Sequence, residues 1–223
     1  RAHGYALAAG GEVLKGGSGR KFHRLRKQNG ETAVLCVYDD SRPENRLYGD
    51  IAGVLRDQIG VQVPQVLAAD KDAGVLVLED LGDTDLWSLA QAAEFPWAPV
   101  ASALEQVAGI HRHGVDAFAA AGVPLMEAFG PNLYQWERQY FQDNALGGRK
   151  PDRAVTDEMA SLAKELMGQP VVTIHRDFQS QNIMVRDGSA WLVDLQGLRH
   201  GCMFYDYASL AFDPYLKRND MDL

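Results

Sequence analysis

The sequence contains little cysteine: only Cys36 and Cys202 occur in 223 residues, far apart and without a C-x-x-C pair. A disulfide scaffold and a zinc ribbon are therefore excluded, because both need paired cysteines. No apolar run approaches the ~20 residues that a membrane span needs, and the beginning of the sequence lacks the pattern of a signal peptide. These absences predict a protein of the reducing cytoplasm without a membrane partner.

Positive charge is also scarce, since 22 Lys and Arg residues stand against 30 Asp and Glu residues. The formal net charge of -8 and the sequence pI near 5.2 would repel a nucleic-acid backbone or an anionic membrane, so neither is expected as the main partner. Apolar residues make up 46% and charged residues 23%, which is usual for a globular protein. The length suits one large domain or two small lobes.

The first third of the chain has the pattern of strands around one helix. A helix is predicted from a capping box of Ser41 and Glu44, with Pro43 in its first turn, and it should end at Gly60. Four apolar residues spaced four apart should form its buried face: Leu47, Ile51, Leu55 and Ile59. Strands are predicted over 12–15, 21–27, 32–38, 65–69 and 74–78, the first two joined by a glycine-rich turn.

Beyond residue 80 the pattern becomes mainly helical. Helices are predicted over 97–114, 131–147 and 157–168, and Trp136 and Tyr140 are expected to be core residues of the second. A strand over 171–174 precedes a hairpin whose turn is Asp187-Gly188, the strongest short hairpin signal. The sequence therefore predicts an α+β protein of two lobes with a cleft between them, where ligands commonly bind.

The residues most informative about chemistry lie in H-R-D-F-Q-S-Q-N at 175–182 and in the strand end at Asp194. Asn182 and Asp194 carry oxygen atoms that suit Mg²⁺, and Asp177 could accept a proton from an attacking hydroxyl. The alternative interpretation is a buried His-Arg-Asp salt-bridge network beside an unrelated hairpin. Likewise, Gly16–Gly19 could be no more than a turn.

Taken together, these segments resemble the H-R-D-x-x-x-x-N loop and D-F-G aspartate of the protein-kinase-like superfamily. More narrowly, the sequence resembles the aminoglycoside phosphotransferase and choline kinase branch. That resemblance implies a β-rich N-lobe over 1–78, a hinge over 79–84 and a helical C-lobe over 85–223, with ATP and Mg²⁺ as cofactors. It also implies these roles: Asp177 as catalytic base, Asn182 and Asp194 as metal ligands, Gly17, Ser18 and Gly19 as the phosphate loop, Glu79 and Leu81 in the adenine-binding hinge, and His175 and Asp206 as structural support.

One part of the kinase pattern is missing, because the strand Val34-Leu35-Cys36-Val37 has Cys36 where kinases carry a lysine. Glu44 is better explained by its cap than by an ion pair with that lysine. Arg20 or Lys21 could supply the lost positive charge, unless both are merely solvated. The gap leaves open a nucleotide-binding pseudokinase without transfer activity.

A small acceptor is favoured over a protein substrate, because Asp194 and Tyr205 are too close in sequence for a kinase activation segment. The segments 78–83, 175–182 and 192–196 resemble bacterial sugar kinases of cell-wall recycling. That resemblance implies phosphorylation of the anomeric hydroxyl of N-acetylmuramate or N-acetylglucosamine in peptidoglycan recycling. Four residues could contact the sugar: Gln179, Glu137, Arg138 and Arg199. An aminoglycoside or choline kinase stays open, as do ATP against GTP and the oligomeric state. Members of the family generally run longer, so part of the acceptor lid is expected to be absent.

Overall fold

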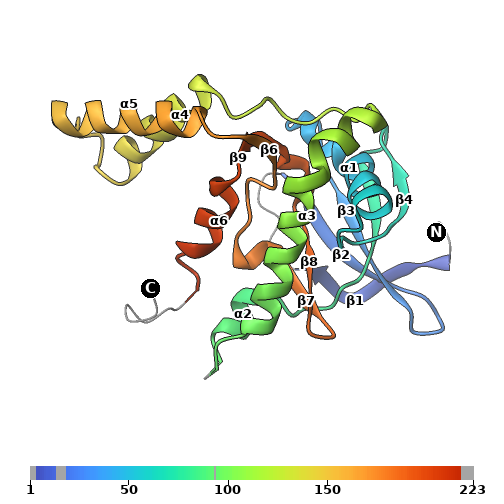
Figure 1. Cartoon of the computed structure of the whole chain (residues 1–223). Helices are drawn as coiled ribbons and strands as arrows, with labels where there is room; N and C mark the ends of the chain where they lie inside the picture. The colour runs from blue at the N-terminus through green and yellow to red at the C-terminus, as the bar shows by residue number, and fades with distance from the viewer. Residues whose placement is uncertain (1–3, 14–18, 93, 217–223) are drawn as a thin grey trace.

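A computed structural model describes residues 4–13, 19–92 and 94–216, with only the backbone of 8–13. Figure 1 shows a β-sheet at one side of the long helix α3, with most of the other helices beyond it. The sheet is antiparallel, with strand order β1-β2-β3-β5-β4. Its strands are β1 (Ala6–Val13), β2 (Lys21–Arg26), β3 (Thr32–Val37), β4 (Val66–Asp70) and β5 (Val75–Glu79).

The helical segment between β3 and β4 confirms the predicted helix but begins differently. It consists of a 3-10 turn η2 (Pro43–Leu47), the helix α1 (Tyr48–Val54) and a π turn η3 (Leu55–Ile59), and Gly60 ends it at φ +83°. The predicted capping box is wrong, because the N-cap is Arg42 and no side chain caps the turn. Both the hydroxyl and the N–H of Ser41 instead donate to the Asp39 carboxylate, a local turn that competes with the cap.

The rest of the described chain is built around α3, which runs 25 residues. The helices of this part are α2 (Leu86–Ala90), α3 (Trp97–Ala121), α4 (Pro131–Asn144), α5 (Arg153–Met167) and α6 (Phe204–Ala211). Two short turns, η4 (Ser180–Asn182) and η5 (Leu195–Gly197), lie between strands. Two pairs of strands complete the fold: β6 (Val171–Ile174) with β9 (Arg199–Cys202), and β7 (Ile183–Arg186) with β8 (Ser189–Leu192).

Helix α3 continues past Gly114, where the sequence predicted its end. A Cβ atom added to Gly114 would lie 2.6 Å from the Cβ of Thr173 in β6. The glycine therefore permits close packing of α3 on β6 rather than capping the helix, and the left-handed cap is Gly122, at φ +63°.

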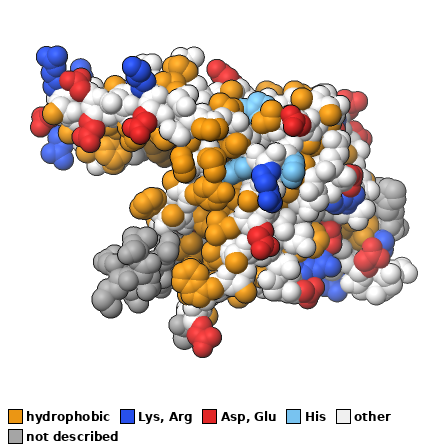
Figure 2. Space-filling model, in the orientation of Figure 1, with side chains coloured by type: hydrophobic (Ala, Val, Ile, Leu, Met, Phe, Trp, Pro, Cys, Tyr) orange, Lys and Arg blue, Asp and Glu red, His pale blue; other side chains and the backbone are white. Residues whose placement is uncertain are grey.

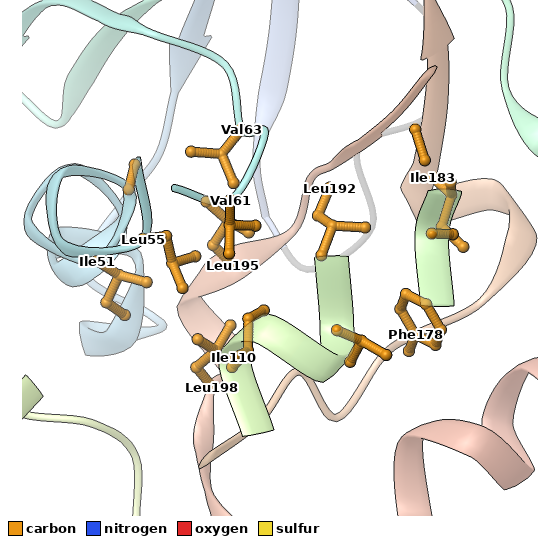
Figure 3. Packing of buried hydrophobic residues seen from close by; sticks show 14 of the residues in the cluster. Ile51, Leu55, Val61, Val63, Ile110, Phe178, Ile183, Leu192, Leu195 and Leu198 are labelled. Carbon is orange, nitrogen blue, oxygen red and sulfur yellow. The ribbon is translucent and has the colours of Figure 1, made fainter. Parts of the chain in front are cut away.

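One hydrophobic cluster joins the sheet side to the helical side. Figure 3 shows Ile51 and Leu55 beside Leu195, with Ile110 of α3 below them. All four of these side chains have no exposed surface. The segments next to Asp177 and Asp194 therefore sit on a core that both halves of the protein share.

Helices α4 and α5 pack on each other and project away from the sheet (Figure 1). The prediction that Trp136 and Tyr140 belong to the core is wrong: they are 49% and 53% exposed, and their rings stack 5.1 Å apart. Figure 2 shows hydrophobic side chains gathered on the face of the molecule in view, below the projecting helices and across the middle of the face. Helical spacing put the two rings on one face, but spacing does not determine whether another element covers that face.

Hydrogen bonds at two places, residue 62 and residue 84, connect the sheet side to the helical side. The N–H of Leu192 donates to the carbonyl of Gln62 at 2.9 Å, and the N–H of Gln62 donates to Oε1 of Gln106 in α3 at 2.8 Å. After β5, the carbonyl of Thr84 accepts from the N–H of Val185 at 2.9 Å. None of the helices among the described residues is long and apolar enough to cross a membrane.

Candidate active site

The loop after β6 positions Asp177 at the surface of the shared core. Its Oδ2 accepts from Nη1 of Arg176 at 2.6 Å, and its carbonyl accepts from Nδ2 of Asn182 at 2.9 Å. Arg176 adopts φ +79°, which is unfavourable for a long side chain and marks a constrained segment. The half-buried carboxylate of Asp177 thus stays accessible on a loop held at both ends.

Asp206 of α6 holds this loop from beneath and has no exposed surface. Its carboxylate accepts from the N–H of His175 at 2.8 Å and from the N–H of Arg176 at 2.9 Å. Nε2 of His111 in α3 lies 2.8 Å from the same carboxylate. The structure therefore brings together the two predicted supports, His175 and Asp206, and adds His111 of α3.

Asn182 and Asp194 flank the hairpin of β7 and β8. Its turn residues Asp187 and Gly188 have φ +52° and +78°, as expected for this turn. The N–H of Val193 donates to the carbonyl of Asn182 at 3.1 Å, which brings the end of β8 beside the start of β7. The next residue, Asp194, has a left-handed φ of +66°, a second constrained position near Asp177.

These two side chains fit a Mg²⁺ ion that is shared with substrate phosphates. Among the described residues no group of three His, Cys, Asp or Glu side chains could form a complete metal cage. One carboxylate and one amide oxygen are instead available, and Mg²⁺ is commonly bound by one or two protein oxygens together with phosphates. Burial raises the pKa of Asp194, but the charge of Arg20 and the hydrogen bonds from Gln196 and Arg20 together outweigh it, so this pKa lies below its usual value.

Arg20, just before β2, reaches Asp194, the aspartate predicted to bind metal. Its guanidinium donates to Oδ1 of Asp194 and, at 2.9 Å, to Oε1 of Gln196. The side chain is 9% exposed, whereas Lys21 is exposed. Of the two cations predicted as substitutes for the missing lysine, Arg20 is the one that the structure places at the site.

Cys36 lies in β3 beside a cavity that holds little more than one water molecule, about 10 Å³. Burial raises the pKa of its thiol to about 11, so Cys36 stays neutral. The cavity is also lined by Asn45, whose side-chain amide is buried and has no hydrogen-bond partner among the described residues. The sequence pattern did not single out Asn45, because it lies in a polar stretch between Glu44 and Arg46.

Three of the four predicted acceptor residues make hydrogen bonds with other described residues, and the side chain of the fourth makes none. Glu137 accepts a hydrogen bond from the Tyr205 hydroxyl at 3.0 Å, and Nε of Arg199 donates to the carbonyl of Gly197, which adjoins Asp177. Burial lowers the pKa of Arg199, and the nearby charge of Arg176 lowers it further. Gln179 contributes its N–H to the carbonyl of Asp177 at 2.9 Å. The half-buried side chain of Arg138 makes no hydrogen bond or ion pair with the described residues.

The predicted hinge is fixed by ion pairs. Glu79 pairs with Arg186 at 2.6 Å, and Leu81 is buried. Arg24 of β2 pairs with Asp80 and with Asp83, each at 2.7 Å. An open groove of about 390 Å³ runs beside these residues. Gly19 has φ +77°, whereas Gly17 and Ser18 lie outside the described residues.

A further buried carboxylate, Asp213, also supports the catalytic loop. Its Oδ2 accepts from the N–H of Ser180 at 2.6 Å. The sequence analysis missed this residue because its only signal was a polar residue near the end of an apolar helix.

Comparison with known proteins agrees with this geometry. Residues 11–221 match the phosphotransferase enzyme family. The N-acetylmuramate/N-acetylglucosamine kinase of Pseudomonas aeruginosa is 28% identical over 227 residues, which cover 96% of this chain and 64% of that protein. The kinase of the same name from Neisseria meningitidis serogroup B is 28% identical over 207 residues, covering 89% and 59%. The chain thus spans about three fifths of the length of these curated relatives.

Solved structures show the same fold. A macrolide 2′-phosphotransferase from Brachybacterium faecium aligns with a TM-score of 0.64 at 17% identity, over 92% of this chain and 72% of that one. The predicted two-lobed, protein-kinase-like α+β fold is therefore confirmed.

Proposed function

We propose that this chain, which belongs to the phosphotransferase enzyme family, transfers the γ-phosphoryl group of ATP to a hydroxyl group of a small molecule. The observation that carries the proposal is the arrangement of Asp177, Asn182 and Asp194. Asn182 bonds to the main chain of Asp177, and the end of β8 holds Asp194 beside it. One site thus combines a half-exposed carboxylate, paired with Arg176, with two candidate oxygen ligands for a cation.

In this proposal Asp177 accepts the proton of the acceptor hydroxyl as its oxygen forms a bond to the γ-phosphorus. The bond from that phosphorus to the β–γ bridging oxygen breaks, and ADP leaves. Asn182 and Asp194 would hold Mg²⁺, which supplies neutralisation of phosphate charge when bound. Asp206 and His111 keep the loop in place, and positioning of this kind accounts for much of the catalysis of phosphoryl transfer.

For the acceptor we propose the anomeric hydroxyl of an N-acetylated amino sugar, in peptidoglycan recycling in the cytoplasm. Two curated relatives carry the name N-acetylmuramate/N-acetylglucosamine kinase. Arg176 and Arg199 lie close enough to influence each other beside Asp177. Two cations next to the acceptor position suit the carboxylate of N-acetylmuramate.

The test is ADP release from Mg-ATP in the presence of N-acetylmuramate, N-acetylglucosamine, choline or an aminoglycoside, with the product identified by phosphorus NMR. An anomeric sugar phosphate is the expected result. Phosphorylated choline or a phosphorylated aminoglycoside would show that the acceptor is that molecule and not the sugar. ATP binding without turnover on any acceptor would favour a nucleotide-binding protein without transfer activity.

Replacing Asp177 by Asn should remove most turnover and leave nucleotide binding intact, because the amide cannot accept the proton but keeps the shape of the side chain. A loss of about 10²- to 10⁴-fold in kcat is expected from the loss of a general base. Asp187→Asn, at the exposed hairpin turn, is the matched control. Turnover near that of the original chain would remove Asp177 from the mechanism.

A further inference from the structure

Arg20 lines the same small cavity as Cys36, the residue that replaces the kinase lysine, although it comes from the segment just before β2 and not from β3. Phe22 of β2 faces Cys36 of β3 in the register of the sheet, and Arg20 lies two residues before Phe22, on the same face. Its guanidinium lies 5.8 Å from the centre of the Phe22 ring. The cavity beside Cys36 is lined by Arg20, Cys36 and Gln196 together.

From this position Arg20 covers Asp194, the carboxylate proposed to bind the metal. The guanidinium bonds to both Asp194 and Gln196, and Nε2 of Gln196 donates to the same Oδ1 of Asp194 at 2.7 Å. A carboxylate oxygen that already accepts two donors, one of them a cation, is a poor ligand for a free divalent ion. Metal binding at Oδ1 of Asp194 therefore requires this contact to change.

We infer that Arg20 is a nucleotide-binding residue with two partners: Asp194 in the nucleotide-free protein, and the phosphates of ATP when metal and nucleotide bind together. The inference rests on the proposed function, which supplies the nucleotide. A planar guanidinium presents several donors and binds phosphate as readily as carboxylate. Asp194 released by Arg20 then becomes available to the metal.

The side chain of Asn45 provides a second observation in favour of a guanidinium of Arg20 that changes position. Its amide is 2% exposed, has no hydrogen-bond partner among the described residues, and lines the same cavity as Arg20. A buried amide without partners is unfavourable. Its carbonyl oxygen is a suitable acceptor for a guanidinium that turns away from Asp194.

The test compares Arg20→Met with the original chain in two binding measurements that do not need an acceptor. The first is Mn²⁺ affinity without nucleotide, measured by electron paramagnetic resonance. The second is the affinity for β,γ-imido-ATP with Mg²⁺, measured by calorimetry. Lys21→Met is the matched control, because it removes the neighbouring cation from an exposed position.

The two affinities should move in opposite directions in Arg20→Met. Mn²⁺ should bind several-fold more tightly, because Asp194 loses its competing cation, while the nucleotide should bind roughly 10- to 100-fold more weakly for want of a charged contact. Lys21→Met should leave both within about twofold. A purely structural role of Arg20 would instead weaken both affinities, and that outcome, or no change in either, would overturn the inference.

Failure of the inference can be told apart from failure of the proposed function. If the original chain binds no imido-ATP, both are overturned. If it binds the nucleotide and Arg20→Met binds equally well, only the role of Arg20 is lost. Circular dichroism on Arg20→Met verifies folding, and Arg20→Lys, which keeps the charge, should recover part of the nucleotide affinity should the methionine variant prove unstable.

Discussion

At the scale of single residues, the site combines negative and positive groups in close alternation. Asp177 pairs with Arg176, Asp194 pairs with Arg20, and Arg199 lies nearby, where Asp177 and Glu127 offset only part of the effect of burial and of Arg176. Burial and the charge of Arg176 both lower the pKa of Arg199, so both make its charged form less stable. A negatively charged acceptor molecule would stabilise the charged form of Arg199.

Arg199→Met should therefore discriminate between two acceptors that differ in a carboxylate. The KM for N-acetylmuramate should rise about 10- to 100-fold, as expected for a lost charge-assisted contact. The KM and kcat for N-acetylglucosamine, which has no carboxylate, should stay nearly constant. Arg153→Met, exposed at the start of α5, is the matched control. An equal effect on both sugars would show that Arg199 does not bind the carboxylate.

At the scale of secondary-structure elements, α3 and α6 hold the catalytic loop through one buried carboxylate. Asp206 accepts hydrogen bonds from two consecutive N–H groups and lies beside His111. An asparagine in its place would turn one acceptor into a donor that faces an N–H group. Such a mismatch in the interior costs the hydrogen bond and leaves a polar group unsatisfied.

We expect Asp206→Asn to lower the free energy of unfolding by about 1–3 kcal/mol. For a chain of this size that corresponds to a fall in Tm of about 2–4 °C for each kcal/mol, measurable by calorimetry. Asp116→Asn, on the exposed side of α3, should have almost no effect. Equal melting temperatures for the two variants would contradict the structural role of Asp206.

At the scale of the whole molecule, Arg24 connects the sheet to the chain that leaves it. Burial raises the pKa of Asp80, but the hydrogen bonds from Arg24 and from the N–H of Gly82 outweigh it, so the pKa lies below its usual value. A carboxylate with a lowered pKa in the folded state stabilises the fold above its unfolded pKa. This contribution is lost as the pH falls through the folded pKa.

Arg24→Met should therefore lower the free energy of unfolding by about 1–2 kcal/mol at pH 7. The difference from the original chain should persist down to about pH 4, near the unfolded pKa of aspartate, and shrink below it. Urea unfolding between pH 3 and 7 measures this, with Arg26→Met, exposed on the same strand, as control. A difference independent of pH would exclude the ion pair as its cause.

Much of this molecule follows from local sequence patterns. The Asp187-Gly188 turn, the helix ending at Gly60 and the H-R-D-x-x-x-x-N loop depend on neighbouring residues, and each could be predicted. The contact of Arg20 with Asp194 joins residues 174 positions apart and depends on the register of β2 against β3. Sequence could name Arg20 as a candidate but could not distinguish it from Lys21.

Other features depended on contacts that no local pattern contains. The continuation of α3 past Gly114 results from packing against Thr173, which is distant in sequence. Trp136 and Tyr140 have the spacing of a buried face, yet they remain exposed because no described element covers that face. The Ser41 cap failed because the Ser41 hydroxyl and N–H donate to Asp39 and the helical turn begins after Arg42 instead.

The bonds of Gln62 to Leu192 and to Gln106 have a mechanical consequence. The covalent chain passes from the sheet to the helices beside residue 84, and the bonded segment at residue 62 is a second point of attachment. Two attachment points define a rotation axis, the line that passes through both of them. The sheet should therefore rock about this line over the phosphates instead of sliding or twisting freely, and Gln106→Ala should loosen one end of the axis.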